Sequence, residues 1–124
     1  MGAQISRRCL PDRYLMTVDR IEVSHTAAEK ADRYLTPGQL KTVLRDHTGY
    51  VCRRASPNHD DLYPDNEFTL RGEFYGLPLD IVFAIESDHV AVITQMSQHS
   101  DSLRGQFYEY VGDTVKDAVE HARS

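Results

Sequence analysis

The sequence contains no tryptophan, only two cysteines, and no apolar run of the roughly 18 to 20 residues that a membrane span needs. With Cys9 and Cys52 as the whole supply of thiols, a fold held together by several disulfides is excluded. A chain of 124 residues does not need such bonds, because one domain of this size buries roughly two-thirds of its surface. The first residues also lack the long apolar stretch of a secretory signal. We therefore expect a cytoplasmic protein with no membrane partner.

Lysine is scarce. The chain has 3 Lys and 11 Arg against 12 Asp and 7 Glu, which gives a net charge of −5. An acidic, lysine-poor surface is typical of salt-adapted proteins, whose carboxylates keep the surface hydrated when salt screens the charges. A GC-rich genome also favours arginine over lysine, and the composition leaves both explanations open. The negative charge disfavours a general nucleic-acid coat protein, because such a protein gains its affinity by neutralising phosphates.

Motifs with strict spacing are also missing. The six histidines and two cysteines are scattered, without the C-x-x-C, H-E-x-x-H or H-x-H spacings that bring metal ligands together. There is no glycine-rich nucleotide loop and no G-x-S-x-G elbow. We therefore expect no metal and no cofactor.

The chain divides into a short arm and one domain. Residues 1–15 mix charges, a proline and isolated apolar residues without a period, which predicts an irregular arm, and residues 16–124 follow as a single domain. Residues 16–23 are rich in β-branched side chains and predict a strand. A helix is expected to begin near Ser24. A second, clearer helix start follows at Thr36, because a proline occupies the next position.

The rest of the chain predicts a run of strands and then a helix. Adjacent strands are expected at 50–54, 67–75, 79–86 and 89–96. The dense apolar run of 79–86 is typical of a central strand. From Leu103 to Ala122 apolar side chains recur every three or four residues, which predicts one long amphipathic helix. The fold class is therefore α+β: a mainly antiparallel sheet of about five strands, two short N-terminal helices and a long C-terminal helix.

The second half of the expected C-terminal helix has a stripe of small apolar residues. They are Val115, Ala118, Val119 and Ala122. A helix about 30 Å long spans the full width of such a domain, so we expect this half to extend past the sheet. An overhanging apolar stripe needs cover, and a two-fold pairing of identical helices is the simplest closed solution. The sequence thus predicts a homodimer through residues 111–122.

Four residues are candidates for catalytic chemistry: His25, Glu29, Arg33 and Arg71. On a helix the first three lie on one side at spacings of four, in the order that favours an ion pair between Glu29 and Arg33. Such a strip polarises the histidine or presents arginine to a phosphate, and Arg71 joins it if the sheet places the two arginines together. The alternative for the first three residues is an ordinary solvated helix face that carries one ion pair. The alternative for Arg71 is that it only balances the charge of acidic residues on neighbouring strands.

Several short segments, in this order and spacing, resemble a known group of proteins. They are Ser24-His25, Arg33, Leu35-Thr36, Gly72, Gly76-Leu77-Pro78-Leu79, Ile81-Val82 and Val92-Ile93-Thr94. Over Arg20 to Gln95 the chain resembles small prokaryotic domains related to the RelE and BrnT toxin superfamily, and its composition suggests a haloarchaeal source. The resemblance implies a compact sheet with two N-terminal helices and a basic face that cleaves messenger RNA on the ribosome. It implies roles there for His25 and Arg33, with Arg71 as a looser match.

The chain departs from that family in two respects, and two functions therefore stay open. It is acidic where such toxins are basic, and the segment from Leu103 onward lies outside the resemblance. The acidic charge and the lack of a catalytic lysine favour a non-catalytic binding or scaffold protein. The alternative is a RelE-like or BrnT-like ribonuclease, or a degenerate relative, with RNA as the less favoured partner.

Overall fold

The computed structural model describes residues 20–54, 66–98 and 108–123. The strands are β1 (Ile21–Val23), β2 (Tyr50–Arg54), β3 (Glu67–Phe74), β4 (Leu77–Ile85), β5 (Val90–Ser97) and β6 (Tyr108–Gly112). The helices are α2 (His25–Ala28), α3 (Pro37–Asp46) and α4 (Val115–Arg123). The predicted arm at residues 1–15 lies outside the described residues.

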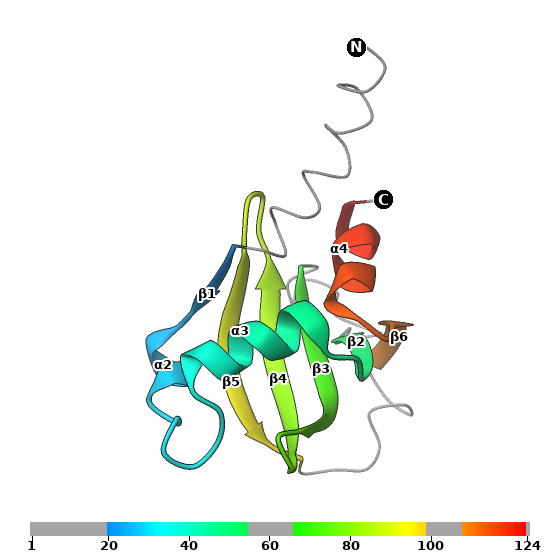
Figure 1. The fold of residues 1–124 in the computed structure, drawn as a ribbon. Helices are drawn as coiled ribbons and strands as arrows, with labels where there is room; N and C mark the ends of the chain where they lie inside the picture. The colour runs from blue at the N-terminus through cyan, green and yellow to red at the C-terminus, as the bar shows by residue number, and fades with distance from the viewer. Residues whose placement is uncertain (1–19, 55–65, 99–107, 124) are drawn as a thin grey trace, which may run out of the picture.

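The strands form one sheet in the order β1-β5-β4-β3-β2-β6 (Figure 1). β1 runs parallel to β5, and all the other neighbouring pairs are antiparallel. This confirms the α+β class and the mainly antiparallel sheet, although the described sheet has six strands instead of about five. β4 lies inside the sheet between β3 and β5, as its apolar run predicts.

Both N-terminal helices begin at the residues that the sequence indicates. Ser24 caps α2 by accepting a hydrogen bond from the Ala27 N–H at 3.1 Å. Thr36 caps α3 and forms a capping box with Gln39. α2 ends at Ala28, however, and residues 29–33 form turns, so the continuous helix expected from His25 to Arg33 is wrong.

The core lies between the sheet and the helices. Figure 1 shows α3 lying across β5, β4 and β3, with α4 near β2 and β6. The fully buried side chains of α3 share one apolar cluster with the sheet; they are Leu40, Val43 and Leu44. Leu70, Ile81 and Phe83 meet them from β3 and β4. None of the helices in the described part of the chain is both long and apolar enough to cross a membrane.

A β-bulge in β5 decides which of its side chains enter the core. Val82 is opposite Thr94, but the next residue, Phe83, is opposite Val92, so Ile93 is the extra residue. Beyond the bulge the alternation is shifted by one, and Gln95 instead of Thr94 lies on the core side. Gln95 is fully buried.

Gln95 binds three backbone groups, one in α2 and two at Leu35, just before α3. Its Oε1 accepts from the Leu35 N–H at 3.0 Å, and its Nε2 donates to the carbonyls of Ala27 at 3.0 Å and Leu35 at 2.8 Å. These bonds hold Leu35 close to the end of α2. The loop is further held by Lys30, whose Nζ donates to Thr94 Oγ1 at 2.9 Å.

β3 and β4 are joined by a two-residue turn at Tyr75 and Gly76, where φ is +53° and +79°. Positive φ at both central positions is the signature of a type I′ hairpin turn. The turn fixes the register, so that Arg71 is opposite Asp80. The positive φ of Tyr75 has a steric cost, because tyrosine carries a side chain. Its ring lies 5.8 Å from the ring of His47 at the end of α3.

The long C-terminal helix predicted from Leu103 is wrong. Residues 99–107 lie outside the described residues, residues 108–112 form β6 beside β2, and α4 begins only at Val115. A capping box starts the helix: Thr114 Oγ1 accepts from the Asp117 N–H at 3.2 Å, and Asp117 Oδ2 accepts from the Thr114 N–H at 3.1 Å.

The apolar stripe of α4 does not overhang the sheet. Val115, Ala118 and Val119 are at most 1% exposed and belong to the core of the same chain. Ala122, the fourth residue of the predicted stripe, is exposed. The structure therefore removes most of the overhang from which the homodimer through residues 111–122 was inferred, and the homodimer itself stays a prediction.

Candidate functional site

The face of the sheet opposite α3 gathers aromatic, charged and polar side chains from several strands. Tyr50, Arg71, Asp80 and Met96 are opposite one another across β2, β3, β4 and β5. Successive residues of a strand point to opposite faces, so this row faces away from the core residues Leu70 and Ile81. The next row runs through Tyr110, Cys52, Thr69, Val82 and Thr94.

We call this surface the tyrosine face and define it by five residues, which are Tyr50, Tyr108, Tyr110, Arg71 and Met96. Tyr108 belongs to it because it lies two positions from Tyr110 on β6. The Tyr110 side chain is 52% exposed, whereas the other four are partly buried. These side chains stand on strands whose backbones are bonded into the sheet, so the face is positioned by rigid elements.

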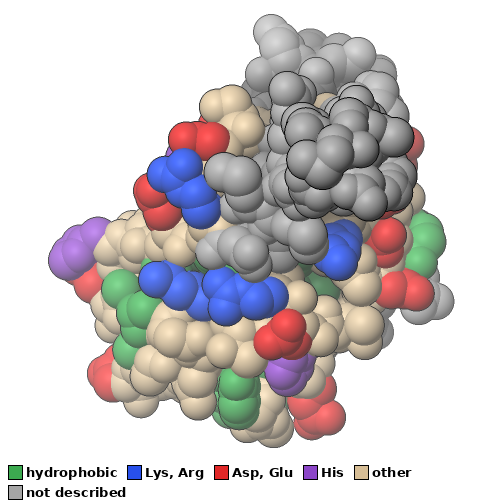
Figure 2. Space-filling model, turned by 45° about the horizontal axis from the view of Figure 1, so that its top comes forward, with side chains coloured by type: hydrophobic (Ala, Val, Ile, Leu, Met, Phe, Trp, Pro, Cys, Tyr) green, Lys and Arg blue, Asp and Glu red, His purple; other side chains and the backbone are tan. Residues whose placement is uncertain are grey.

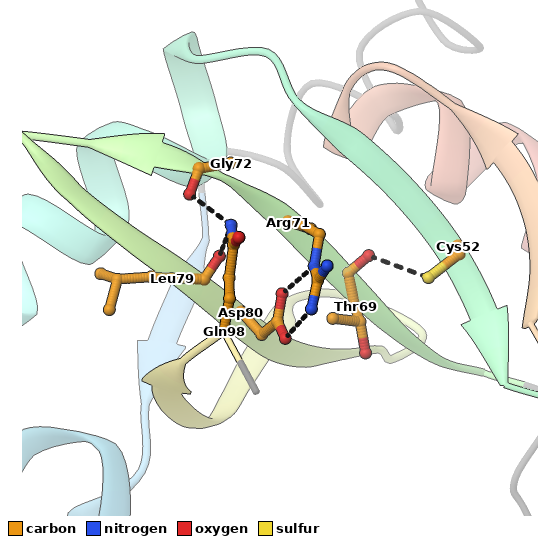
Figure 3. Close-up of polar contacts among 7 residues, drawn as sticks. All are labelled: Cys52, Thr69, Arg71, Gly72, Leu79, Asp80 and Gln98. Atoms are coloured by element: carbon orange, nitrogen blue, oxygen red, sulfur yellow. Dashed lines mark hydrogen bonds and ion pairs between the residues drawn. The ribbon is translucent and has the colours of Figure 1, made fainter. Parts of the chain in front are cut away.

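An ion pair between Arg71 and Asp80 lies in the middle of the face (Figure 3). Arg71 Nε donates to Asp80 Oδ1 at 2.9 Å, and a terminal guanidinium nitrogen donates to Oδ2 at 3.1 Å. The two side chains are only 14% and 10% exposed. The hydrogen bonds to Asp80 raise the pKa of Arg71, against the opposing effect of burial. A phosphate would have to displace Asp80 to obtain the same two-pronged contact.

We expect Arg71→Met to lower the free energy of unfolding by roughly 2 to 3 kcal/mol, because it leaves the Asp80 carboxylate buried without its charged partner. Urea denaturation measures the change. The control is Arg20→Met, since the pair of Arg20 with Asp88 is 53% and 58% exposed and is expected to contribute much less to stability. Equal effects of the two substitutions would show that Arg71 and Asp80 are no better bound than a surface pair.

Cys52 is fully buried beside this ion pair. Its thiol donates to the Thr69 carbonyl at 3.8 Å (Figure 3). Burial raises the pKa of Cys52 to about 12, and the Asp80 charge adds to the effect while Arg71 opposes it. A thiol in this state is protonated at neutral pH and cannot serve as a nucleophile.

Alkylation tests the state of this thiol. In a Cys9→Ser background at pH 8, we expect Cys52 to react about a thousandfold more slowly in the folded protein than in urea. The reason is that raising the pKa from 9.0 to about 12 lowers the fraction of thiolate by about that factor. Labelling with iodoacetamide followed by mass spectrometry measures both rates. Similar rates in the two states would contradict the burial of Cys52.

Tyr50 and Tyr110 form the aromatic part of the face. Their ring centroids are 5.0 Å apart and the rings are tilted by 36°. The Tyr110 hydroxyl donates to Asp113 Oδ1 at 2.5 Å, which raises the pKa of Tyr110. The hydrogen bond fixes the orientation of the ring.

The structure brings together only part of the predicted catalytic set. His25 Nε2 lies 2.7 Å from Glu29 Oε2, but these side chains are 87% and 61% exposed. The guanidinium of Arg33 lies over the ring of its neighbour Tyr34, 5.5 Å from the centroid. Arg71 stands on β3, separated from β1 and α2 by β4 and β5, and is bound to Asp80.

Other features of the described residues add no catalytic site. They contain no group of three or more His, Cys, Asp or Glu side chains able to hold a metal. A cavity of about 220 Å³ is lined by Arg53, Asn66, His121 and Ala122, away from all four predicted candidates. Figure 2 shows Lys and Arg side chains in a band across the helical side and only scattered hydrophobic ones, outside the grey atoms. That side has the character of a solvated surface.

The sequence does not predict the tyrosine face, because the apolar period from Leu103 onward predicts a helix for Tyr108 and Tyr110. A signal existed in the alternation of Tyr108 and Tyr110 with Glu109 and Val111, which fits a strand as well as a helix. Comparison with protein-family models, with curated proteins and with solved structures gave no match.

Proposed function

We propose that this chain is a non-catalytic protein-binding domain and that the tyrosine face is its docking surface. The observation that carries the proposal is the composition of that face: Tyr50, Tyr108, Tyr110, Arg71 and Met96 lie together on one side of the sheet. Tyrosine, arginine and methionine are the residue types enriched at protein interfaces, and tyrosine and arginine are frequent hot spots of binding energy.

The geometry favours docking of a preformed surface. The side chains of the face are held before any partner arrives: Arg71 by Asp80, and Tyr110 by Asp113 and the Tyr50 ring. Side chains already fixed in place lose little conformational entropy on binding. Tyr110 also offers a large exposed ring to a partner.

A ribonuclease receives less support from the same geometry. His25 is almost fully exposed and is paired with Glu29 alone, and the fork of Arg71 is occupied by Asp80. General acid and base catalysis requires such groups to converge on one reacting atom. Arg71 instead stands on β3, separated by β4 and β5 from β1 and from α2, which carries His25.

Paired variants of the tagged full chain test the proposal. We expect Tyr50→Ala/Tyr110→Ala to reduce co-purification of the bound protein by at least about tenfold, because each hot-spot tyrosine contributes roughly 2 kcal/mol. The matched control is Lys41→Ala/Arg45→Ala, which removes two exposed side chains from α3. Thermal melts confirm that both variants fold. Equal capture by all three proteins, or a loss confined to the α3 variant, would contradict the tyrosine face as the docking surface.

An RNA assay tests the alternative directly. Purified chain is incubated with single-stranded RNA beside the His25→Ala/Arg33→Ala variant. We expect no difference in cleavage between the two. Cleavage that depends on His25 and Arg33 would contradict a non-catalytic function.

A further inference from the structure

The part of the tyrosine face on β6 combines an exposed ring with a carboxylate. Tyr110 is 52% exposed and is one of two large hydrophobic residues that are exposed in the described part of the chain. Its hydroxyl donates to Asp113 Oδ1 at 2.5 Å, so the carboxylate lies at the edge of the ring. The ring of Tyr50 packs against that of Tyr110 and helps to hold it in place. We call Tyr110 and Asp113 together the Tyr110 corner.

The charge of the Tyr110 corner is not neutralised by an ion pair. Asp113 is exposed, and no Lys, Arg or His among the described residues pairs with it or with Asp117. This holds also for Lys116, the nearest basic residue along the chain. Asp117 adds a second carboxylate, which the N–H groups of Asp113 and Thr114 hold at 2.8 and 3.1 Å. The corner is therefore negative.

The ring and the carboxylates attract a partner of the same charge. The hydrogen bond to Asp113 is the largest cause of the raised pKa of Tyr110, and the charges of Asp113 and Asp117 raise it further. The same negative field favours a positive charge beside the ring. The face of a tyrosine ring also attracts cations, because its π electrons make the face negative.

We propose that the protein partner of the tyrosine face places an arginine side chain at the Tyr110 corner. A planar guanidinium stacks on a tyrosine ring and also donates from its edge to a carboxylate, whereas the ammonium of lysine is a compact and strongly hydrated charge. The net charge of −5 favours the approach of a basic segment. This inference rests on the proposed function and names the chemistry of the partner.

Fluorescence anisotropy tests the role of the carboxylate. A labelled peptide in which arginine alternates with glycine is titrated with the full chain at physiological salt. We expect Asp113→Asn to weaken binding at least about fivefold, although asparagine can still accept the hydrogen bond from Tyr110. The control is Asp46→Asn, which removes the same charge at the exposed end of α3 and should change the affinity less than about twofold. Equal weakening by both variants, or no binding to the wild-type chain, would overturn the inference.

Two further comparisons test the guanidinium and the ring. A peptide with lysine in place of arginine should bind at least about threefold more weakly. Tyr110→Leu keeps an apolar side chain but removes the π face, so it should weaken binding of the arginine peptide. Tyr75→Leu should not, although Tyr75 is 51% exposed in the turn between β3 and β4. Equal affinity for the two peptides, or equal effects of the two leucine variants, would contradict arginine recognition at this corner.

Capture of the cellular partner by the tagged full chain separates this inference from the proposed function. Loss of the partner with both Tyr50→Ala/Tyr110→Ala and Asp113→Asn, but not with Asp46→Asn, is the expected result. If the double tyrosine variant loses the partner and Asp113→Asn retains it, the proposed function stands and arginine recognition is refuted. If all the variants retain the partner, both are refuted.

Discussion

Replacing Gln95 with leucine is expected to lower the free energy of unfolding by about 3 to 5 kcal/mol. The substitution removes the Gln95 partner of the Leu35 N–H and of the Leu35 carbonyl in the buried core. It also removes one of two hydrogen bonds to the Ala27 carbonyl, which still accepts from the Lys30 N–H at 3.3 Å. A buried polar group without a partner costs roughly 1 to 3 kcal/mol, and leucine fills most of the vacated volume, so the loss reports on hydrogen bonds more than on a cavity. Urea denaturation monitored by circular dichroism measures it.

Gln98, the residue after the end of β5, provides the control. Its amide donates at 3.2 Å to the Gly72 carbonyl and at 3.5 Å to the Leu79 carbonyl, and it is only partly buried (Figure 3). We expect Gln98→Leu to cost less than about 1 kcal/mol. A Gln95→Leu protein as stable as the Gln98→Leu protein would show that Gln95 does not hold the loop between α2 and α3.

Two neighbours in β4 are expected to differ sharply when each is replaced by alanine. Phe83 is fully buried and stacks on Phe68 at a centroid distance of 5.8 Å, so Phe83→Ala should cost roughly 3 to 5 kcal/mol. Val82 points to the other face, where it is partly exposed between Thr69 and Thr94. Val82→Ala should cost roughly 1 kcal/mol.

The two variants are compared by the midpoint of urea denaturation with a shared slope. Both residues belong to one apolar run, so the hydrophobicity of the sequence does not predict different effects for them. The difference is expected because successive side chains of a strand point to opposite faces of the sheet. Equal losses would mean that β4 is covered alike on both faces and that the tyrosine face is part of the core.

The elements that the sequence predicts well are those defined by local signals. The start of α3 is defined by three residues in the first turn. Thr36 and Gln39 each accept a hydrogen bond from an N–H that would otherwise be unpaired, and Pro37 has no N–H to pair. The run around Ile81 predicts an interior strand because few polar side chains interrupt it. In both cases the information lies within a few neighbouring residues.

The C-terminal segment could not be assigned in this way, because its outcome depends on a distant partner. Tyr108 to Gly112 fit a helical period, yet β2 offers them a backbone ladder, and β6 forms instead. The pair Thr114 and Asp117 was a local signal for a later helix start that the apolar period concealed. In β5, the bulge at Ile93 moves Gln95 into the core against simple alternation.

The candidate site was predictable in its parts but not in its arrangement. The i,i+4 contact of His25 with Glu29 follows from one helical turn. The pairing of Arg71 with Asp80 follows from a two-residue turn at Tyr75 and Gly76. This turn is hard to predict from the sequence, because its first residue is usually asparagine or glycine and here is tyrosine. The gathering of tyrosines from β2 and β6 requires the order of the strands, which the sequence alone does not supply.

Site-specific photo-crosslinking in cells that express the chain tests the central claim, that the tyrosine face binds a protein partner. A benzophenone side chain replaces Tyr50 on the face or, in a matched chain, Lys41 on α3. The proposed function predicts a discrete protein adduct from position 50 and none from position 41. Adducts from position 41 alone, or an adduct of position 50 with RNA in place of protein, would contradict it.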